Sequence, residues 1–549
     1  MPAIYYHPEA YSIKGPKLMG RNAAGESFLR GFLKYSKSNE FWVQIEKSEH
    51  ADDFRKKVLA SARTEAVRTV NRSSLPALSK AGVLFYPGPD IGSQALHRNL
   101  HGSGLWSLCG ITHTTSSQRA MDSIVHLITA PVQPWDALIC TSQTVKNNVE
   151  HILQAQINYL RDRLGITKFI APQLPIIPLG IHTTDFNFSK DDRGFSRKKL
   201  EIDNETLVVL YMGRLSFHAK AHPIAMYRAL ERATKKTKKK VVLIECGWHA
   251  NISIEKIYKE TSSKICPSVR IINLDGREAN QRKIAWSSAD IFCSLSDNIQ
   301  ETFGIVPIEA MAAGIPVVVS DWDGYKDTVR NGIDGFRSPT YMPQSGLGTD
   351  LAFRHSAGID NYDMYCGLTC SLIAVDIEAT ANSFEQLFLS KNLRLKMGTA
   401  GRQRAQEVYE WKVIIEQYEN LWEELDALRN KKSQKIKPMK FPWPARMDPF
   451  HAFASYPTHT ISSNIFVDKV DQNIKSSLKT ALELRNSKMV NFAQYVLPKE
   501  EEIQLILNEI EKGSKSVKDI VENTPEKRKP YLIRSLGWLI KMGLLKVIN

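Results

Sequence analysis

Short apolar runs alternate with longer amphipathic stretches along most of the chain. The short runs are apolar at successive positions, which indicates strands buried on both faces, whereas the longer stretches have the apolar spacing of helices. The expected strands include 81–86, 137–140, 207–211, 241–244, 269–272, 291–293 and 316–319. Alternation of strand and helix predicts parallel sheets. We therefore expect an α/β protein with two doubly wound parallel-sheet domains, over 1–195 and 200–416, separated by the polar stretch 189–199.

The chain changes character after a helix expected over 417–428. Residues 429–440 contain six basic side chains and no acidic one, and a Phe-Pro-Trp-Pro run follows them. We therefore expect 429–498 to be a basic, proline-stiffened linker and irregular segment. Beyond it, 499–549 has apolar positions at helical spacing and resembles a helix-turn-helix module of winged-helix type. Such a module serves either DNA or protein contacts, and both interpretations stay open.

Composition excludes a disordered protein, a fibre and a low-complexity scaffold for most of the chain. The 549 residues are 43% hydrophobic and 24% charged, which is typical of a soluble globular protein. Lys plus Arg numbers 73 against 58 for Asp plus Glu, and the net charge of +15 suits phosphate-bearing or anionic partners. The stretch closest to a membrane span, 303–319, contains Glu309 and two prolines, and no apolar leader is present. We expect a cytoplasmic protein, with peripheral contact to a membrane surface left open.

The seven cysteines indicate a reducing compartment. Their number is odd and no two have C-x-x-C spacing, so neither a disulfide framework nor a zinc site is expected. Several lie in apolar runs, where a thiol behaves as a small hydrophobic group.

The strongest candidate for chemistry is the segment 301–314, ETFGIVPIEAMAAG. A strand is expected to lead through a loop into a helix whose first turn holds Pro307, a residue tolerated there because its missing N–H has no partner to lose. Gly304 would let the backbone approach a ligand closely. The amides of 303–306 would then face an anion at the positive end of the helix.

Two glutamates, Glu301 and Glu309, stand before and within that helix. As carboxylates they would repel a phosphate, so they suit hydroxyl groups on either side of a diphosphate, a sugar on one side and a ribose on the other. The alternative is that they only complement the helix dipole, and it stays open for Glu309 in particular.

The Glu-x7-Glu spacing and four further phrases in the same order resemble the family 4 glycosyltransferases, a large retaining group with the GT-B fold. The other phrases are 211–215 followed by Lys220, 178–182 followed by Phe186, 135–142 and 331–336. The resemblance covers roughly residues 15–427. It implies an acceptor-side Rossmann-like domain, then a nucleotide-sugar-binding domain facing it across a cleft. It also implies a helix, starting around Trp411, that crosses back to the first domain.

The resemblance implies roles for particular side chains. Arg214 and Lys220 would grip the donor diphosphate and neutralise the leaving group, so that no metal or other cofactor would be needed. Glu301 would bind the donor sugar and Glu309 the ribose. His113 would lie near the sugar, although a histidine after a strand is equally compatible with a structural role. The full donor-binding set is Gly20, Gly25, Gly213, Phe303, Gly304, Ile305 and Glu309.

Three features depart from the family pattern. The first-domain loop 20–25, GRNAAG, expected before a helix over 26–35, has an Arg-Asn pair where the family has glycines. A phrase ending at Asp327 replaces the usual Gly-Gly-x-x-Glu, so that residue is only a partial equivalent. The stretch 340–383 is longer than the usual connection and has no assigned role.

We expect a retaining, metal-independent hexosyltransferase that moves a sugar from a nucleotide-diphosphate sugar to an acceptor hydroxyl of a glycan, a lipid-linked substrate or a small molecule. Two alternatives stay open. One is a GT-B relative such as a nucleotide-sugar epimerase or a phosphorylase, although no pyridoxal-phosphate lysine can be identified. The other is a retired GT-B scaffold with a nucleic-acid- or protein-binding tail, against which the presence of Glu301, Arg214 and Lys220 argues. The sequence does not specify the donor base, the sugar, the acceptor or the oligomeric state.

Overall fold

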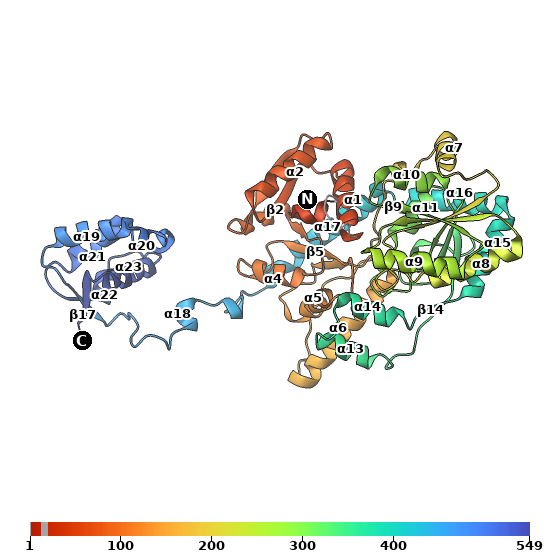
Figure 1. Cartoon of the computed structure of the whole chain (residues 1–549). Helices are drawn as coiled ribbons and strands as arrows, with labels where there is room; N and C mark the ends of the chain where they lie inside the picture. Colours follow the sequence, from red (N-terminus) through yellow and green to blue (C-terminus); the bar gives the residue numbers. More distant parts are fainter. Residues whose placement is uncertain (1, 13–19, 549) are drawn as a thin grey trace. The chain divides into compact units, whose positions relative to one another are not determined.

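The computed structural model describes residues 2–12 and 20–548. The chain forms two compact units, Met1–Trp443 and Pro444–Asn549. The first unit contains two parallel sheets with helices on both sides of each (Figure 1).

The first sheet has six parallel strands in the order β3-β2-β1-β4-β5-β6. Its strands are β1 (Pro2–Tyr6), β2 (Glu40–Ile45), β3 (Ala66–Val70), β4 (Val83–Phe85), β5 (Ser107–Ile111) and β6 (Ala137–Ile139). The helices around it are α1 (Gly20–Tyr35), α2 (Ser48–Ala60), α3 (Leu78–Ala81), α4 (Ile91–Asn99), α5 (Gln118–Thr129) and α6 (Gln143–Leu164), with 3₁₀ turns η1 (Pro8–Tyr11) and η2 (Leu75–Ala77).

The second sheet repeats this topology, with the order β12-β11-β10-β7-β8-β9. Its strands are β7 (Leu207–Met212), β8 (Val241–Gly247), β9 (Arg270–Asp275), β10 (Ile291–Ser294), β11 (Val317–Ser320) and β12 (Gly335–Ser338). The accompanying elements are η3 (Thr183–Phe186), α7 (Lys190–Lys199), α8 (Ile224–Thr237), α9 (Ile252–Ile265), α10 (Ala279–Ser288), α11 (Ile305–Ala312), α12 (Tyr325–Thr328), α13 (Thr349–Ser356), α14 (Tyr362–Cys370), α15 (Ile377–Leu389) and α16 (Lys391–Val408), with an antiparallel pair β13 (Thr340–Tyr341) and β14 (Ala374–Val375). The predicted fold class, two doubly wound parallel sheets as in GT-B proteins, is confirmed.

The apolar stretch 303–319 forms α11 and β11, which lie in the core of the second domain. Ile308 and Val317 to Val319 are fully buried there. In the part of the chain that the structure describes, no helix is long and apolar enough to cross a membrane.

The expected boundary at residue 195 is wrong, because the polar stretch 189–199 is largely the helix α7 and belongs to the second domain. Arg193 donates to a carboxylate oxygen of Asp290 at 2.6 Å, and Arg197 donates to the other oxygen at 3.2 Å. Asp290 directly precedes β10, so these charged side chains fasten α7 to the second sheet. A polar segment of ten residues is therefore a packed helix and not a spacer.

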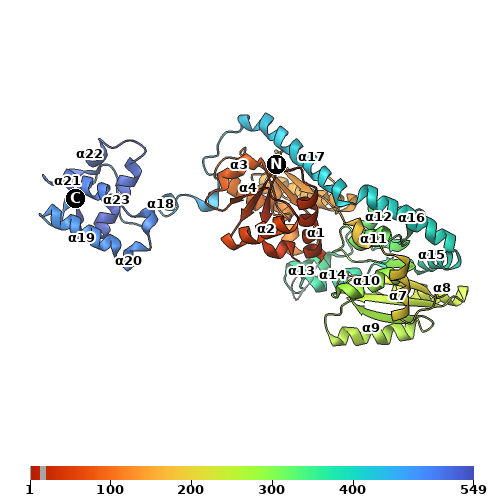
Figure 2. The same ribbon diagram turned by 90° about the horizontal axis from the view of Figure 1, so that it is seen from above.

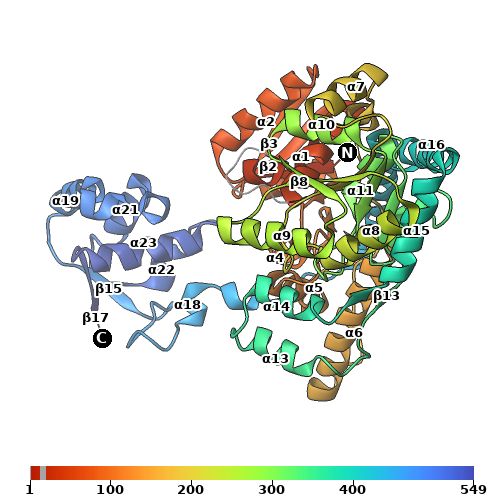
Figure 3. The ribbon, with the colours of Figure 1, turned by 45° about the vertical axis from the view of Figure 1, so that its right-hand side comes forward.

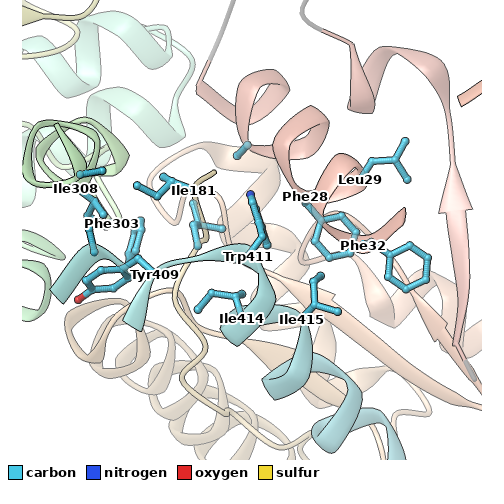
Figure 4. Close-up of a cluster of buried hydrophobic side chains, with 14 of the residues drawn as sticks. Phe28, Leu29, Phe32, Ile181, Phe303, Ile308, Tyr409, Trp411, Ile414 and Ile415 are labelled. Carbon is cyan, nitrogen blue, oxygen red and sulfur yellow. The ribbon is translucent and has the colours of Figure 1, made fainter. Parts of the chain in front are cut away.

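The helix α17 (Trp411–Lys432) returns from the second domain to the first, as the resemblance implies, and is longer at both ends than the expected 417–428. Trp411 Nε1 donates to Ser27 Oγ at 2.7 Å, and a Cβ atom at Gly31 would stand 2.6 Å from the Trp411 ring. Figure 4 shows Trp411 beside Phe28 of α1, and Figure 2 shows α17 running along the first domain. The buried cluster that contains Trp411 is continuous between the two domains.

The second unit has a three-stranded antiparallel sheet in the order β16-β15-β17. Its elements are η5 (Pro444–Arg446), α18 (Pro449–Ala452), β15 (Phe466–Lys469), α19 (Ile474–Asn486), α20 (Lys488–Asn491), η6 (Gln494–Val496), α21 (Glu500–Glu509), β16 (Lys515–Ser516), α22 (Val517–Val521), α23 (Lys529–Lys541) and β17 (Leu545–Ile548). A further 3₁₀ turn, η4 (Ser433–Lys435), ends the helical run of the first unit.

The expected linker over 429–498 is wrong in its second half. Val467 of β15 and Ala481 of α19 are fully buried in the core of the second unit, and β15 is the central strand of its sheet. A four-residue strand gives too weak a local pattern to be recognised without its partners. The helical pattern predicted after 499 is confirmed by α21, α22 and α23, while the winged-helix resemblance stays a prediction.

Candidate functional site

The candidate site lies where the strand order of the second sheet reverses. Strands β7 and β10 are parallel neighbours at its centre. The loop after β7 carries Arg214 and Lys220, and the loop after β10 carries Glu301. In doubly wound sheets, the carboxyl ends of the strands at such a switch point are where ligands bind. The topology therefore brings together two phrases that are about 80 residues apart in the sequence.

Lys220 and Glu301 form an ion pair across these two loops. Lys220 Nζ lies 2.6 Å from Glu301 Oε2, and the Glu301 side chain is 11% exposed. Burial disfavours the charged form of Glu301, but the ammonium and its hydrogen bond outweigh it, so the pKa of Glu301 lies below its ordinary value. The carboxylate is therefore ionised at neutral pH and can accept hydrogen bonds from hydroxyl groups.

Arg214 stands at the other end of the same loop. Its Nη2 donates to the carbonyl oxygen of Ala219 at 2.7 Å, which folds the loop back beside Lys220. Gly213, directly before it, has a φ of +147°, a conformation that side chains rarely allow. The loop thus carries two cations, and the Arg214 guanidinium has further N–H donors that could bind an anion.

The helix α11 begins after Gly304, as the sequence predicts, but this glycine serves packing. Its φ is +86°, and a Cβ atom there would stand 2.1 Å from the ring of Tyr325. Phe303 is 2% exposed and packs on Tyr409, so its side chain belongs to the core. The main-chain N–H groups of Phe303, Gly304 and Ile305, and not their side chains, can therefore bind an anion at the helix N-terminus.

Glu309 lies within α11 in surroundings different from those of Glu301. Burial, only partly offset by the nearby Arg282, raises the pKa of Glu309 to about 7. The surroundings of the two glutamates of the motif therefore shift their pKa values in opposite directions, down for Glu301 and up for Glu309.

The first domain meets this site through the loops after β5 and β6. The hydroxyl of Thr302 donates to the carbonyl oxygen of His113 at 3.3 Å, and the hydroxyl of Thr141 donates to the carbonyl oxygen of Thr302 at 3.3 Å. The structure therefore places the His113 main chain against the residue that follows Glu301. The candidate catalytic residues come from both domains.

Asp327, the partial equivalent of a family residue, contacts the first domain. Its Oδ2 accepts a hydrogen bond from the backbone N–H of Gln143 at 2.6 Å, in the first turn of α6. Asp323 lies beside it with a φ of +42°, and Ser142 Oγ donates to its carboxyl oxygen at 3.4 Å. Burial, with Glu301 nearby, raises the pKa of Asp323 to about 8. Sequence reasoning missed Asp323, for which the Asp-Gly dipeptide was the only local signal.

The loop predicted over 20–25 is wrong, because α1 begins at Gly20. A Cβ atom at Gly25 would stand 2.0 Å from the carbonyl oxygen of Ala10, so this glycine lets the helix pack against η1. Asn22 Nδ2 donates to the carbonyl oxygen of Glu9 at 2.7 Å, which supports the same contact. A donor-binding role of Gly20 and Gly25 stays a prediction.

Within residues 2–12 and 20–548, no three His, Cys, Asp or Glu side chains are grouped so that they could hold a metal ion. All seven cysteines are free thiols and buried.

Residues 192–345 match the sequence model of the family described as "Glycosyl transferases group 1". An uncharacterized glycosyltransferase of Methanocaldococcus jannaschii is 24% identical over 151 residues, which are 28% of this chain and 36% of that protein. The phosphatidyl-myo-inositol mannosyltransferase of Mycobacterium leprae is 50% identical over 56 residues, which are 10% of this chain and 14% of that protein. The chain thus matches about a third or less of the length of these relatives.

Among solved structures, Anabaena HepE in complex with UDP is similar at 13% identity and a TM-score of 0.48, over 77% of this chain and 99% of that protein. The segment matched by the family model contains Arg214, Lys220, Glu301, Glu309 and Asp327.

Proposed function

We propose that this chain is a retaining glycosyltransferase that moves a sugar from a nucleotide-diphosphate sugar to an acceptor hydroxyl. The observation that carries the proposal is the contact of Lys220 with Glu301 at the switch point of the second sheet, in a segment that matches the glycosyl transferases group 1 family. Retention of configuration is taken from the resemblance to family 4.

The chemistry follows from the charges at the site. When the bond between the sugar and the diphosphate breaks, negative charge grows on the departing phosphate oxygen. Arg214, Lys220 and the amides at the start of α11 supply fixed positive potential for that charge. Glu301, which is ionised, accepts hydrogen bonds from sugar hydroxyls and orients the anomeric carbon towards the acceptor.

Metal independence is part of the proposal. Two cations from one loop and a helix N-terminus supply the charge stabilisation that a divalent ion gives in other phosphate chemistry. Lys220 Nζ binds Glu301 in the structure. When a diphosphate binds, the ammonium would either move towards it or donate one hydrogen bond to Glu301 and another to the phosphate.

The acceptor side is proposed to be the first domain. A polar pocket lies there along α5. It is lined by Asp90, which precedes α4, and by Gln118, Arg119, Asp122, Ser123 and His126 of α5. Carboxylate, amide and hydroxyl groups of this kind suit a polyhydroxylated acceptor. An inositol-containing acceptor, as in the name of the Mycobacterium leprae relative, would be of that class.

A ligand screen with the full-length protein tests the proposal. Thermal shifts are measured with UDP-, GDP- and ADP-sugars in the presence of EDTA, because a ligand at 100 times its dissociation constant stabilises by about 2.7 kcal/mol. The sugar nucleotide that binds is then incubated with a panel of polyols and glycans. Product formed only with an acceptor supports transfer. Isomerised donor without an acceptor would identify an epimerase instead, and an absence of binding to any sugar nucleotide would contradict the proposal.

A further inference from the structure

The segment between β13 and β14, residues 342–373, forms the helices α13 and α14. The family match ends at residue 345, so these helices lie beyond it. In Figures 1 and 3, α14 lies beside α5 of the first domain, although the chain on both sides of it belongs to the second domain. This insertion is the part of the first unit for which the sequence suggests no role.

The first relevant contact is a close approach of α14 to the loop that carries both cations. A Cβ atom at Gly367 would stand 3.1 Å from His218 Cβ and 3.2 Å from the His218 carbonyl oxygen. A Cβ atom at this position would require α14 or the loop to shift by a few tenths of an ångström, and a larger side chain would require a larger shift. His218 is two residues before Lys220, so its main chain determines where that side chain begins.

The second contact fixes the same carbonyl group. The His218 oxygen accepts a hydrogen bond from Asn298 Nδ2 at 3.2 Å, and Cys370 Sγ of α14 lies 3.9 Å from it. Asn298 is fully buried and follows β10 on the way to Glu301. The middle of the loop 213–220, which carries Arg214 and Lys220 and is called the cation loop below, therefore packs between α14 and the loop that carries Glu301.

The third contact joins α14 to the first domain. Tyr362 Oη, in the first turn of α14, lies within hydrogen-bond distance of Ser116 Oγ at 3.4 Å. Ser116 is three residues after His113, in the loop that follows β5. One helix thus touches both the loop of Arg214 and Lys220 and the loop of His113.

We propose that α14 is a positioning element of the donor site, in which Gly367 and Cys370 fix the cation loop and Tyr362 ties it to the His113 loop. The insertion then sets the distance between the two cations and the diphosphate, and couples that site to the acceptor-side domain. This inference rests on the proposed function.

The test compares two glycines of the same insertion. Gly367→Leu forces the side chain against His218, whereas Gly348→Leu enters open space, since nothing lies within 4 Å of a Cβ atom there. We expect Gly367→Leu to weaken binding of the nucleoside diphosphate that the wild type prefers among UDP, GDP and ADP by about tenfold or more. Gly348→Leu should bind like the wild type. If the wild type binds none of them, the proposed function fails, which is distinct from a failure of this inference.

Two conservative variants test the tie to the first domain, and keep the test decisive if Gly367→Leu does not fold. Tyr362→Phe and Ser116→Ala each remove one hydroxyl of the pair. We expect each to lower kcat several-fold with little change in nucleotide affinity, and the double variant to be no worse than either single one. Equal affinity of folded Gly367→Leu and wild type, or an unchanged kcat in both hydroxyl variants, would overturn the proposal.

Discussion

Lys220 Nζ lies 2.6 Å from Glu301 Oε2, and this ion pair joins the loops that follow two neighbouring strands of the second sheet. Each side chain has a different task in the proposed reaction, one at the diphosphate and one at the sugar. The contact with Lys220 offsets the cost of burying the Glu301 carboxylate and holds the pKa of Glu301 below its ordinary value.

Lys220→Met should weaken nucleotide binding by about 10- to 100-fold, since a charge-assisted hydrogen bond to the diphosphate is lost. Lys239→Met, an exposed lysine of the basic run after α8, is the matched control and should leave affinity unchanged. Isothermal titration calorimetry with the preferred nucleoside diphosphate measures the affinity of each variant. Similar affinities would show that Lys220 is a surface charge without a role in donor binding.

Donor binding and transfer should survive EDTA. Arg214, Lys220 and the N-terminus of α11 would provide the positive potential that stabilises the departing diphosphate. The measurement is the initial rate of transfer before and after chelation. Loss of activity that Mn²⁺ or Mg²⁺ restores would contradict the assigned chemistry.

A protein truncated after Trp443 should fold and bind nucleotide, whereas one truncated at residue 430 should be less stable. Asn99 Nδ2 donates to the carbonyl oxygen of Pro442 at 2.6 Å, and the Trp443 ring packs on His97. The second unit has its own buried core. Melting temperatures and nucleotide affinity of the two truncated proteins test this, and an insoluble 1–443 fragment would show that the units depend on each other.

Glu245 should make the second domain less stable as the pH rises. Burial raises the pKa of Glu245 to about 7 from an ordinary value of 4.5, although Tyr227 donates a hydrogen bond to it. Between those values the folded chain holds a proton that the unfolded chain has released, so the free energy of unfolding falls as the pH rises. Above the folded pKa the loss is complete, on the order of 3 kcal/mol.

Glu245→Gln should therefore remove this part of the pH dependence and raise the melting temperature at pH 8 more than at pH 5. Glu260→Gln, at an exposed position of α9, is the control and should leave the difference between the two pH values as in the wild type. A wild-type curve as flat as that of the variant would show that Glu245 is ionised in the folded protein.

The sequence was informative where function and fold depend on local patterns. The inner strands β7, β8, β10 and β11 are apolar at almost every position because they are buried on both faces. The loops after β7 and β10 carry motifs that can be recognised from the sequence alone. Expectations from the sequence were wrong or incomplete where the role of a residue depends on packing against another part of the chain. Gly25 is predicted to lie in a loop but lies within α1, where it packs against the Ala10 carbonyl oxygen. Asp323 and the strand β15 depend on partners far along the chain.

Variants of Glu301 and Glu309 distinguish the proposed sugar-binding role of the first from the proposed ribose-binding role of the second. Glu309 would contact the ribose, which does not react, so Glu309→Ala should weaken binding of nucleotide and nucleotide sugar equally, by about 1–3 kcal/mol. A carboxylate that only complements the helix dipole would cost about 0.3–1 kcal/mol of stability and leave binding unchanged.

The most direct test of the account is the turnover of Glu301→Gln, measured together with its affinity for the free nucleoside diphosphate. If Glu301 holds the sugar as charge develops at its anomeric carbon, kcat should fall by about 100-fold or more. Affinity should stay level or rise slightly, because Lys220 is released from its partner and becomes available to the diphosphate. Near-normal turnover in a folded Glu301→Gln protein would contradict the assignment of this site as the place of sugar transfer.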